Sequence, residues 1–275
     1  MGVNIVCTAK PCDGLLYYSY EYCSYLNSIG THACLIIISH PMFTEEDYFN
    51  AITEKYTFYD NVIVDDFAYS GVTLIMGRSM MTLGYKDRES YKIDQLLLLH
   101  LLFRDKVISV YSENHPVEYS QALEYFCPEE VIDLCDYDIY PNGEGKPFEK
   151  RIWFDIYKPI EKDIQFQYLF NGTNSQYYNA AKSVIQKYPD HGIMIYDIGV
   201  INSRFNNLVV PIPNVLGIFE TYVYTKSILD PAPRIIQECI YYKKDMIFEA
   251  TNRGAEVYKN RKIQKLDVKN IVNEL

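Results

Sequence analysis

The sequence predicts an α/β protein with two halves, each built on a parallel sheet. Short runs of apolar and β-branched residues alternate with longer segments of helical periodicity, as in chains that form successive strand–helix–strand units. Several of these runs are apolar throughout, which is typical of strands that helices cover on both faces. A loop-like stretch at residues 141–150 separates two such series. The chain has 275 residues, enough for two small hydrophobic cores.

The first half, residues 1–150, begins with a strand, a helix and a second strand. Gly30 is placed to end this helix, and Thr44 followed by Glu45 and Glu46 is a start signal for the next one. The alternation then continues as far as the loop. The expected strands are residues 3–8, 34–39, 61–65, 72–76, 106–111 and a segment within 131–140, and the expected helices are residues 15–29, 44–56, 93–103 and 117–126.

The second half, residues 151–275, repeats the alternation after a linker that holds two Gly, two Pro and four charged residues. We expect a hinge near residues 141–160. The two halves are therefore predicted to be Rossmann-like domains that face each other across a cleft. The expected strands are residues 163–170, 193–196, 207–212, 217–224 and 245–248, and the expected helices are residues 176–187, 232–242, 254–259 and 268–275.

The composition argues against several classes of protein. No run of 18 apolar residues occurs, so we expect neither a membrane-spanning helix nor a membrane partner. The seven cysteines are odd in number and include no C-x-x-C pair, which fits neither a disulfide framework nor a zinc site and favours a reducing cytoplasm. The net charge of −10 argues weakly against a long DNA-binding face, although 26 Lys and Arg remain for a local basic groove.

The common nucleotide and hydrolase motifs are missing from the sequence. No Gly-x-Gly-x-x-Gly follows the first strand, so a classical dinucleotide oxidoreductase is not expected. The chain has no Gly-x4-Gly-Lys-Ser/Thr loop, which excludes a P-loop ATPase or kinase. A Gly-x-Ser-x-Gly elbow is also absent.

The clearest chemical pattern lies near the C-terminal end, in Asp230-Pro-Ala-Pro-Arg234-Ile-Ile-Gln-Glu238. Proline is compatible with the first turn of a helix, and the amides and dipole of a helix start attract phosphate. Arg234 adds a fork of donors suited to a diphosphate, and Glu238, one turn further, is placed to accept both hydroxyls of a ribose. The pattern indicates a nucleoside diphosphate. An ordinary intrahelical Arg–Glu pair is the alternative.

These residues resemble a family. Asp230-x7-Glu238 is similar to the paired-acid signature, Glu-x7-Glu, of retaining GT-B glycosyltransferases, and residues 242–248 look like the turn and strand that follow it. The resemblance covers the architecture of the chain, with about 25 residues alike at motif level. The chain departs from the pattern in having Asp for the first Glu, in Lys243-Lys244 where Gly is usual, and in its short length. Its composition and length also resemble phage enzymes that add glucose or arabinose to hydroxylated or hydroxymethylated pyrimidines of their own DNA.

The resemblance implies a set of donor-binding residues. Gly172 and Thr173 would form the first phosphate-side loop, although a plain turn between strand and helix is the alternative for this segment. Lys226 would help neutralise the leaving diphosphate, unless it is simply a solvated lysine. The implied donor site comprises Gly172, Thr173, Asp197 beside the nucleobase, Lys226, Asp230 near the sugar, Arg234 at the diphosphate and Glu238 at the ribose.

A candidate catalytic base lies in the first half. Asp13 follows the first strand, where open α/β sheets bind ligands, and would take a proton from an acceptor hydroxyl as in inverting enzymes. Helix capping by Asp13 is the alternative, and His40 after the second strand is another candidate base. The adjacent Asp65 and Asp66 lack the spacer of the metal-binding Asp-x-Asp motif. We therefore expect no metal and no cofactor other than the donor substrate.

Together these observations predict a glycosyltransferase that moves a sugar from a UDP- or other NDP-sugar to an acceptor hydroxyl. The favoured acceptor is a hydroxymethylated or hydroxylated cytosine in phage DNA, in the host cytoplasm, which requires extrusion of the base. A small-molecule, protein or polysaccharide acceptor is an alternative. So is a non-catalytic nucleotide- or sugar-binding protein on the same architecture. Whether the mechanism retains or inverts configuration stays open.

Overall fold

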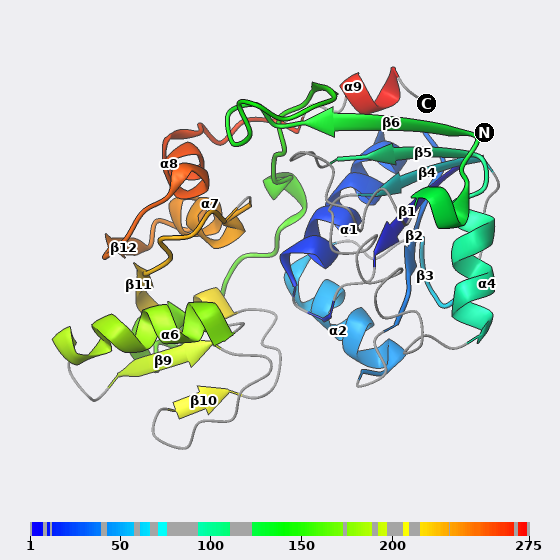
Figure 1. Ribbon diagram of the computed structural model, residues 1–275. Coiled ribbons are helices and arrows are strands. Elements are labelled where there is room, and N and C mark those ends of the chain that lie inside the picture. Colours follow the sequence, from blue (N-terminus) through cyan, green and yellow to red (C-terminus); the bar gives the residue numbers. More distant parts are fainter. Residues whose placement is uncertain are drawn as a thin grey trace. The chain divides into compact units, whose positions relative to one another are not determined.

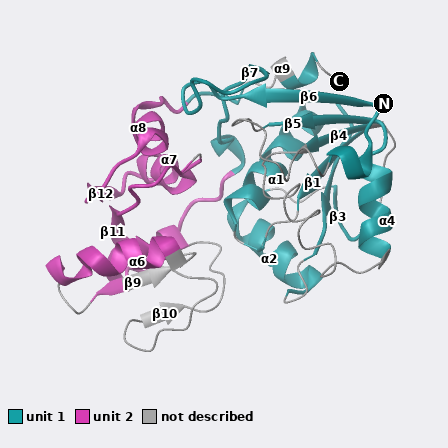
Figure 2. Ribbon diagram, in the orientation of Figure 1, with its two compact units in different colours: residues 1–156, 264–275 teal, residues 157–263 magenta. Residues whose placement is uncertain are grey.

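The structure, a computed structural model, describes residues 2–7, 10–11, 13–39, 43–57, 61–66, 71–75, 93–110, 123–172, 175–188, 192–196, 206–208, 215–230, 232–266 and 269–273. The chain divides into two compact units (Figure 2). Unit 1 comprises residues 1–156 and 264–275, and unit 2 comprises residues 157–263.

Unit 1 is built on a parallel sheet whose seven described strands have the order β3-β2-β1-β4-β5-β6-β7 (Figure 1). The first six positions follow the order of the doubly wound dinucleotide-binding fold. The strands are β1 (Gly2–Cys7), β2 (Ala33–Ile37), β3 (Val62–Val64), β4 (Gly71–Ile75), β5 (Lys106–Ser109), β6 (Glu130–Cys135) and β7 (Lys146–Pro147).

Helices cover this sheet. Among the described residues of unit 1, the longer helices are α1 (Gly14–Ser28), α2 (Glu45–Lys55) and α4 (Ile93–Leu102), and Figure 1 shows α1 and α4 on opposite sides of the sheet. Apolar side chains of α4 form one core cluster with Val6, Ile36 and Val107. Thr44 caps α2, and its capping box is completed by Asp47. The start signal that the sequence gives for α2 is therefore confirmed.

The linker predicted at residues 141–150 is not wholly a loop. It contributes β7, which pairs in parallel with the end of β6 through Leu134 with Lys146 and Cys135 with Pro147. This strand was not predicted, because it is two residues long and contains a proline. Proline is tolerated here because β7 lies at the edge of the sheet, where its missing N–H breaks no ladder.

Unit 2 repeats the arrangement on a smaller scale. Its five described strands are parallel and have the order β10-β9-β8-β11-β12. Renumbered within the unit, this is again the order 3-2-1-4-5. The strands are β8 (Phe166–Asn171), β9 (Ile193–Tyr196), β10 (Asn206–Leu208), β11 (Phe219–Tyr224) and β12 (Asp245–Phe248).

Three α-helices lie in the part of unit 2 that the structure describes. They are α6 (Ser175–Val184), α7 (Arg234–Tyr241) and α8 (Arg253–Asn260). Side chains of α6, including Tyr178 and Ala181, pack on Phe170 and Val223 of the sheet. Figure 1 shows α7 beside α8, and the two helices are in contact.

The last residues of the chain belong to unit 1 rather than to the second half. The chain leaves unit 1 after Ile156 and returns at Gln264, and the short helix α9 (Lys269–Val272) follows. Leu266 and Ile271 are buried. The boundary predicted from the sequence lies instead at residues 150/151, with the whole C-terminal segment in the second half. The reason for the difference is that apolar periodicity predicts a helix without indicating which sheet the helix covers.

The predicted α/β class with parallel sheets is confirmed in both units. None of the helices in the described part of the chain combines the length and the apolarity needed to cross a bilayer.

Candidate functional site

The sheet of unit 2 has one point at which the strand order reverses, between β8 and β11. In open α/β sheets the carboxyl ends of the strands at such a point form the usual ligand crevice. The segment that follows β11 runs from Thr225 to Pro233, where α7 begins. Gly172, which follows β8, is buried at the same end of the sheet. Predicted donor-site residues therefore follow both strands of the reversal.

The first charged pair of this site lies in the loop after β11. Lys226 Nζ and Asp230 Oδ2 are 2.5 Å apart, and both side chains are buried. The Lys226 ammonium also lies 3.7 Å from the centre of the Tyr177 ring, on α6. This cation–π contact joins the loop after β11 to the helix that follows β8. The alternative that Lys226 is a solvated lysine is therefore wrong.

The second charged pair is on α7. Arg234 Nε donates to Glu238 Oε1 at 2.8 Å, one helical turn away, and both residues are about 95 % buried, with 5 % of their surface exposed. Tyr157 completes the group, because its hydroxyl accepts from Arg234 Nη2 and donates to Glu238 Oε1 at 3.0 Å. The intrahelical Arg–Glu pair, given above as the alternative to a ligand-binding pair, is thus present. It is buried, and both of its side chains also form hydrogen bonds with Tyr157.

Residues at the start of α8 contact the loop that carries the Lys226–Asp230 pair. Asn252 caps α8, and its amide nitrogen lies 2.6 Å from the Tyr224 hydroxyl and 3.1 Å from the Lys226 carbonyl. Gly254 packs so closely that an added Cβ would lie 1.8 Å from the carbonyl oxygen of Asp230. These contacts fix the backbone that carries the Lys226–Asp230 pair.

The helix start differs from the prediction. The sequence indicated a helix from residue 232, but α7 begins at Arg234, with Pro233 as its cap and no side-chain capping bond. Two of its first three amides have backbone acceptors: Arg234 N–H donates to Ala232 O and Ile236 N–H donates to Pro233 O. Recognition of a diphosphate by this site would therefore depend more on side chains than on free helix amides.

Neighbouring hydroxyl and thiol groups of the site stay protonated near neutral pH. Burial, and then the charge of Glu238, raises the pKa of the Cys239 thiol, so Cys239 is no ready nucleophile. Burial also raises the pKa of Tyr224, with a contribution from the Asp230 carboxylate. Tyr224 therefore serves as a hydrogen-bonding group rather than as a base.

Two predicted donor residues, Thr173 and Asp197, lie outside the described residues, as does His40. Asp13, the candidate base, caps α1 by accepting from Leu15 N–H at 2.8 Å. The helix-capping role considered for Asp13 is therefore present. Its position, after β1 at the point where the order of the larger sheet reverses, is also the expected ligand end of unit 1.

Asp65 is held in place by hydrogen bonds. Its carboxylate accepts from Ser39 N–H and from Gln95 Nε2, both at 2.9 Å, and from the Ser39 hydroxyl at 2.5 Å. These three donors join the ends of β2 and β3 to α4. Within the described ranges, no group of three His, Cys, Asp or Glu side chains is arranged to hold a metal ion.

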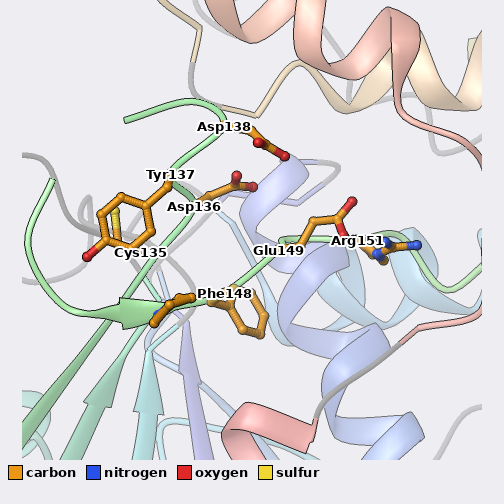
Figure 3. A pocket seen from close by; sticks show the side chains of 8 residues that line it. Cys135, Asp136, Tyr137, Asp138, Phe148, Glu149 and Arg151 are labelled. Atoms are coloured by element: carbon orange, nitrogen blue, oxygen red, sulfur yellow. Dashed lines mark hydrogen bonds and ion pairs between the residues drawn. The ribbon is translucent and has the colours of Figure 1, made fainter. Parts of the chain in front are cut away.

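Unit 1 has a hollow of about 370 Å³ at the carboxyl end of β6 (Figure 3). Arg151 is its one cationic lining residue and already pairs with Glu149 and Gln264. A lining with three carboxylates and one paired cation is unsuited to a phosphate backbone. The lining residues are Cys135, Asp136, Tyr137, Asp138, Pro147, Phe148, Glu149 and Arg151.

Several residues of the site were not predicted from the sequence. Tyr157 lies 81 positions before Glu238, and no local pattern links the two. Tyr177 falls within the helix predicted at residues 176–187, and no local pattern marks it as part of a site. Asn252 and Gly254 offered a usable signal, because Asn two residues before Gly at a helix start indicates a cap and a close backbone approach.

Comparisons with known proteins give no further guidance, since no family model matches the chain and no relative is found among curated proteins.

Proposed function

We propose that unit 2 binds the nucleotide of an NDP-sugar at the loop after β11 and the start of α7, and that the protein is a glycosyltransferase. The observation that carries this proposal is the position of two buried ion pairs, Lys226–Asp230 and Arg234–Glu238, where the strand order of the sheet reverses. Reversals of this kind are the usual nucleotide sites of parallel α/β sheets.

The residue types suit the proposed ligand. Arg234 and Lys226 are two cations on adjoining segments, as a diphosphate requires. Glu238 and Asp230 supply carboxylates that accept hydrogen bonds from sugar hydroxyls. Buried ion pairs add little to stability compared with apolar side chains of similar size. Their presence at the ligand end of the sheet is therefore better explained by binding than by folding.

The proposal extends to both units. In a GT-B-like arrangement unit 2 holds the donor and unit 1 holds the acceptor, with Asp13 as the candidate base. Asp13 then needs one carboxylate oxygen for the acceptor hydroxyl while the other caps α1, as it does in the structure. A UDP-sugar is the first donor to test, and no metal is required in this scheme.

A modified cytosine in phage DNA remains the proposed acceptor. The acidic hollow of unit 1 argues that DNA phosphates bind elsewhere on the protein, because its three carboxylates repel them. A smaller uncharged acceptor suits that hollow better and is the alternative within the glycosyltransferase proposal.

A second candidate, a nucleotide-binding protein without catalysis, is favoured by one observation. Both cations of the site are already paired with carboxylates of the same loop and helix. A nucleotide must therefore compete with an internal partner, which limits its affinity but does not require any reaction.

Turnover separates the two candidates. The protein is incubated with UDP-glucose and other NDP-sugars, with and without DNA that contains hydroxymethylcytosine, and NDP release is measured. Release that depends on DNA supports a DNA glycosyltransferase. Release that requires an added small sugar, and not DNA, indicates a small-molecule acceptor. Binding of UDP without release from any donor leaves the non-catalytic protein.

A matched pair of variants tests the site. Glu238→Gln keeps the shape of the side chain but removes its charge, and we expect UDP affinity to fall by roughly 1–3 kcal/mol. Glu249→Gln is the control, because Glu249 forms the same kind of contacts, with Lys187 and Tyr188, in the same unit. Calorimetric titration with UDP measures both. Equal affinities for the two variants would place the ribose contact elsewhere.

A further inference from the structure

The chain passes between the units at two places, and each crossing is held on both sides. At the first crossing the Ile156 carbonyl accepts from the amide and the hydroxyl of Thr57 within unit 1, at 2.8 and 3.0 Å. The next residue, Tyr157, belongs to unit 2 and is bound through its hydroxyl to Arg234 and Glu238. Two consecutive residues are thus fixed in different units.

The second crossing is held by the same helix. Gln237, which precedes Glu238 on α7, donates through Nε2 to the carbonyls of Tyr258 and Arg261, the latter at 2.9 Å. Beyond the crossing, Gln264 accepts from Arg151 Nη1 within unit 1 at 2.6 Å. The proposed ligand helix therefore carries adjacent residues that hold both connecting segments.

A third contact strengthens the first crossing. Tyr242, which caps the C-terminal end of α7, donates its hydroxyl to the Lys158 carbonyl at 3.0 Å. Its ring lies 6.3 Å from that of Tyr157. Residues 157 and 158 are consequently both held by α7, Tyr157 by Arg234 and Glu238 and Lys158 by the C-terminal cap Tyr242.

We propose that Tyr157 is a positioning residue for Glu238, and that through this bond the occupancy of the nucleotide site sets the freedom of the connection between the units. The proposal rests on the nucleotide site proposed above. Its basis is that one carboxylate oxygen, Glu238 Oε1, accepts from both Tyr157 and Arg234. A ligand hydroxyl that donates to Glu238 meets a carboxylate already oriented by these two donors.

Ligand binding at Glu238 and the hydrogen bond between Tyr157 and Glu238 affect each other reciprocally. A ligand that strengthens the position of Glu238 strengthens the hold on Tyr157, and loss of that hold weakens the ligand by the same factor. Because the three side chains are 5–6 % exposed, water replaces a lost bond poorly. Tyr157→Phe should therefore loosen the first crossing and weaken nucleotide binding together.

The first experiment needs no ligand. Amide hydrogen exchange is measured at residues 157, 158 and 160, which flank Pro159, in the full chain, in Tyr157→Phe and in Glu238→Gln. We expect exchange about tenfold faster in both variants, as for loss of one hydrogen bond to a charged group. Tyr188→Phe and Glu249→Gln are the controls, since the first removes a Tyr–Glu hydrogen bond of 2.8 Å elsewhere in unit 2 and the second removes the charge of its acceptor. Equal exchange in test and control variants would overturn the link between Glu238 and the crossing.

The second experiment adds UDP. In the unmodified protein, UDP should slow exchange at residues 157, 158, 160 and 258–263, and Tyr157→Phe should bind UDP about tenfold more weakly than Tyr188→Phe. If UDP binds equally to both variants, the positioning role of Tyr157 is wrong while the nucleotide site stands. If neither UDP nor any other nucleoside diphosphate binds the unmodified protein, the proposed function fails and the coupling to occupancy fails with it. The ligand-free exchange then still decides whether Glu238 holds the crossing.

Discussion

At the scale of single residues, the candidate site consists of charges that are removed from water and paired. Bringing Arg234 and Glu238 into the interior costs several kcal/mol for each ion before their attraction offsets it. Removing one partner leaves the other as an unpaired buried charge, which destabilises the fold. An Ala variant therefore cannot distinguish weaker ligand binding from loss of folding. The amide substitution Glu238→Gln is therefore the more informative variant.

Gly254 gives a prediction at this scale. In Gly254→Ala the new Cβ would lie 1.8 Å from the Asp230 carbonyl oxygen, so the backbone of the loop must move. We expect a loss of about 1–3 kcal/mol in the free energy of unfolding, as for overpacking, together with weaker UDP binding. Urea unfolding and calorimetric titration measure the two effects.

Gly30→Ala is the control for this substitution. Gly30 has a φ of +87° but nothing within 4 Å of the added Cβ. Its cost should be about 1 kcal/mol, from the backbone conformation alone, with no change in UDP affinity. A Gly254→Ala protein as stable as Gly30→Ala, and with normal UDP affinity, would show that the contact with Asp230 has no role in shaping the site.

The sequence predicts contacts between site residues that are close along the chain, but not contacts between residues far apart in it. Arg234 and Glu238 were predicted to act together, because helical periodicity places residues i and i+4 on one face. Their third partner, Tyr157, is remote in sequence, and its contact exists only once the chain has folded. The sequence predicted the residue types of the site, but could not decide between an internal ion pair and a ligand-binding pair.

At the scale of elements, the order of strands and helices was predictable while several boundaries were not. Residues 193–196 and 245–248 form strands with the predicted ends, and α1 agrees within one residue at each end. α7 begins two residues later than predicted, because Pro233 takes the cap position. The short strand β7 escaped prediction, since pairing with β6 and not local propensity makes it a strand.

A contact between elements of unit 2 gives a pH-dependent prediction. Hydrogen bonds from Lys187 and Tyr188 hold the pKa of the Glu249 carboxyl below its usual value. A lowered pKa in the folded state means that this contact stabilises the protein above the unfolded-state pKa of about 4.3 and is lost as the pH falls through the lower folded value. The unmodified protein should therefore lose stability between about pH 5 and pH 3 more steeply than Glu249→Gln.

Thermal unfolding of both proteins across that range measures the difference. Glu220→Gln serves as the control, since Glu220 is an exposed carboxylate of the same unit. Parallel pH profiles for the unmodified protein and Glu249→Gln would show that the ion pair is absent in solution.

At the scale of the whole molecule, both units use the same strand order although they share no evident sequence repeat. The repeated order was predictable in outline, because alternating strands and helices favour parallel sheets. The return of the chain to unit 1 was not predictable. It depends on where the side chains of the last segment find apolar partners, and sequence periodicity does not specify those partners.

The returning segment yields a prediction for the whole chain. Ile271 is fully buried while its neighbour Val272 is 37 % exposed. Ile271→Ala should cost about 2–5 kcal/mol, and that loss should fall on unit 1. Val272→Ala should cost little. Hydrogen exchange in urea, followed separately in β1 and in β11, shows which unit is weakened. Equal weakening of both strands would mean that the units unfold as one.

Because unit 1 is built from two separate stretches of chain, its two parts are synthesised at different times. During synthesis the ribosome completes residues 157–263 before it adds residues 264–275, which belong to unit 1. Unit 1, although begun first, therefore cannot bury Leu266 and Ile271 until every residue of unit 2 has been synthesised. A chain that stops just before residue 264 would contain all of unit 2 but would leave the core of unit 1 incomplete.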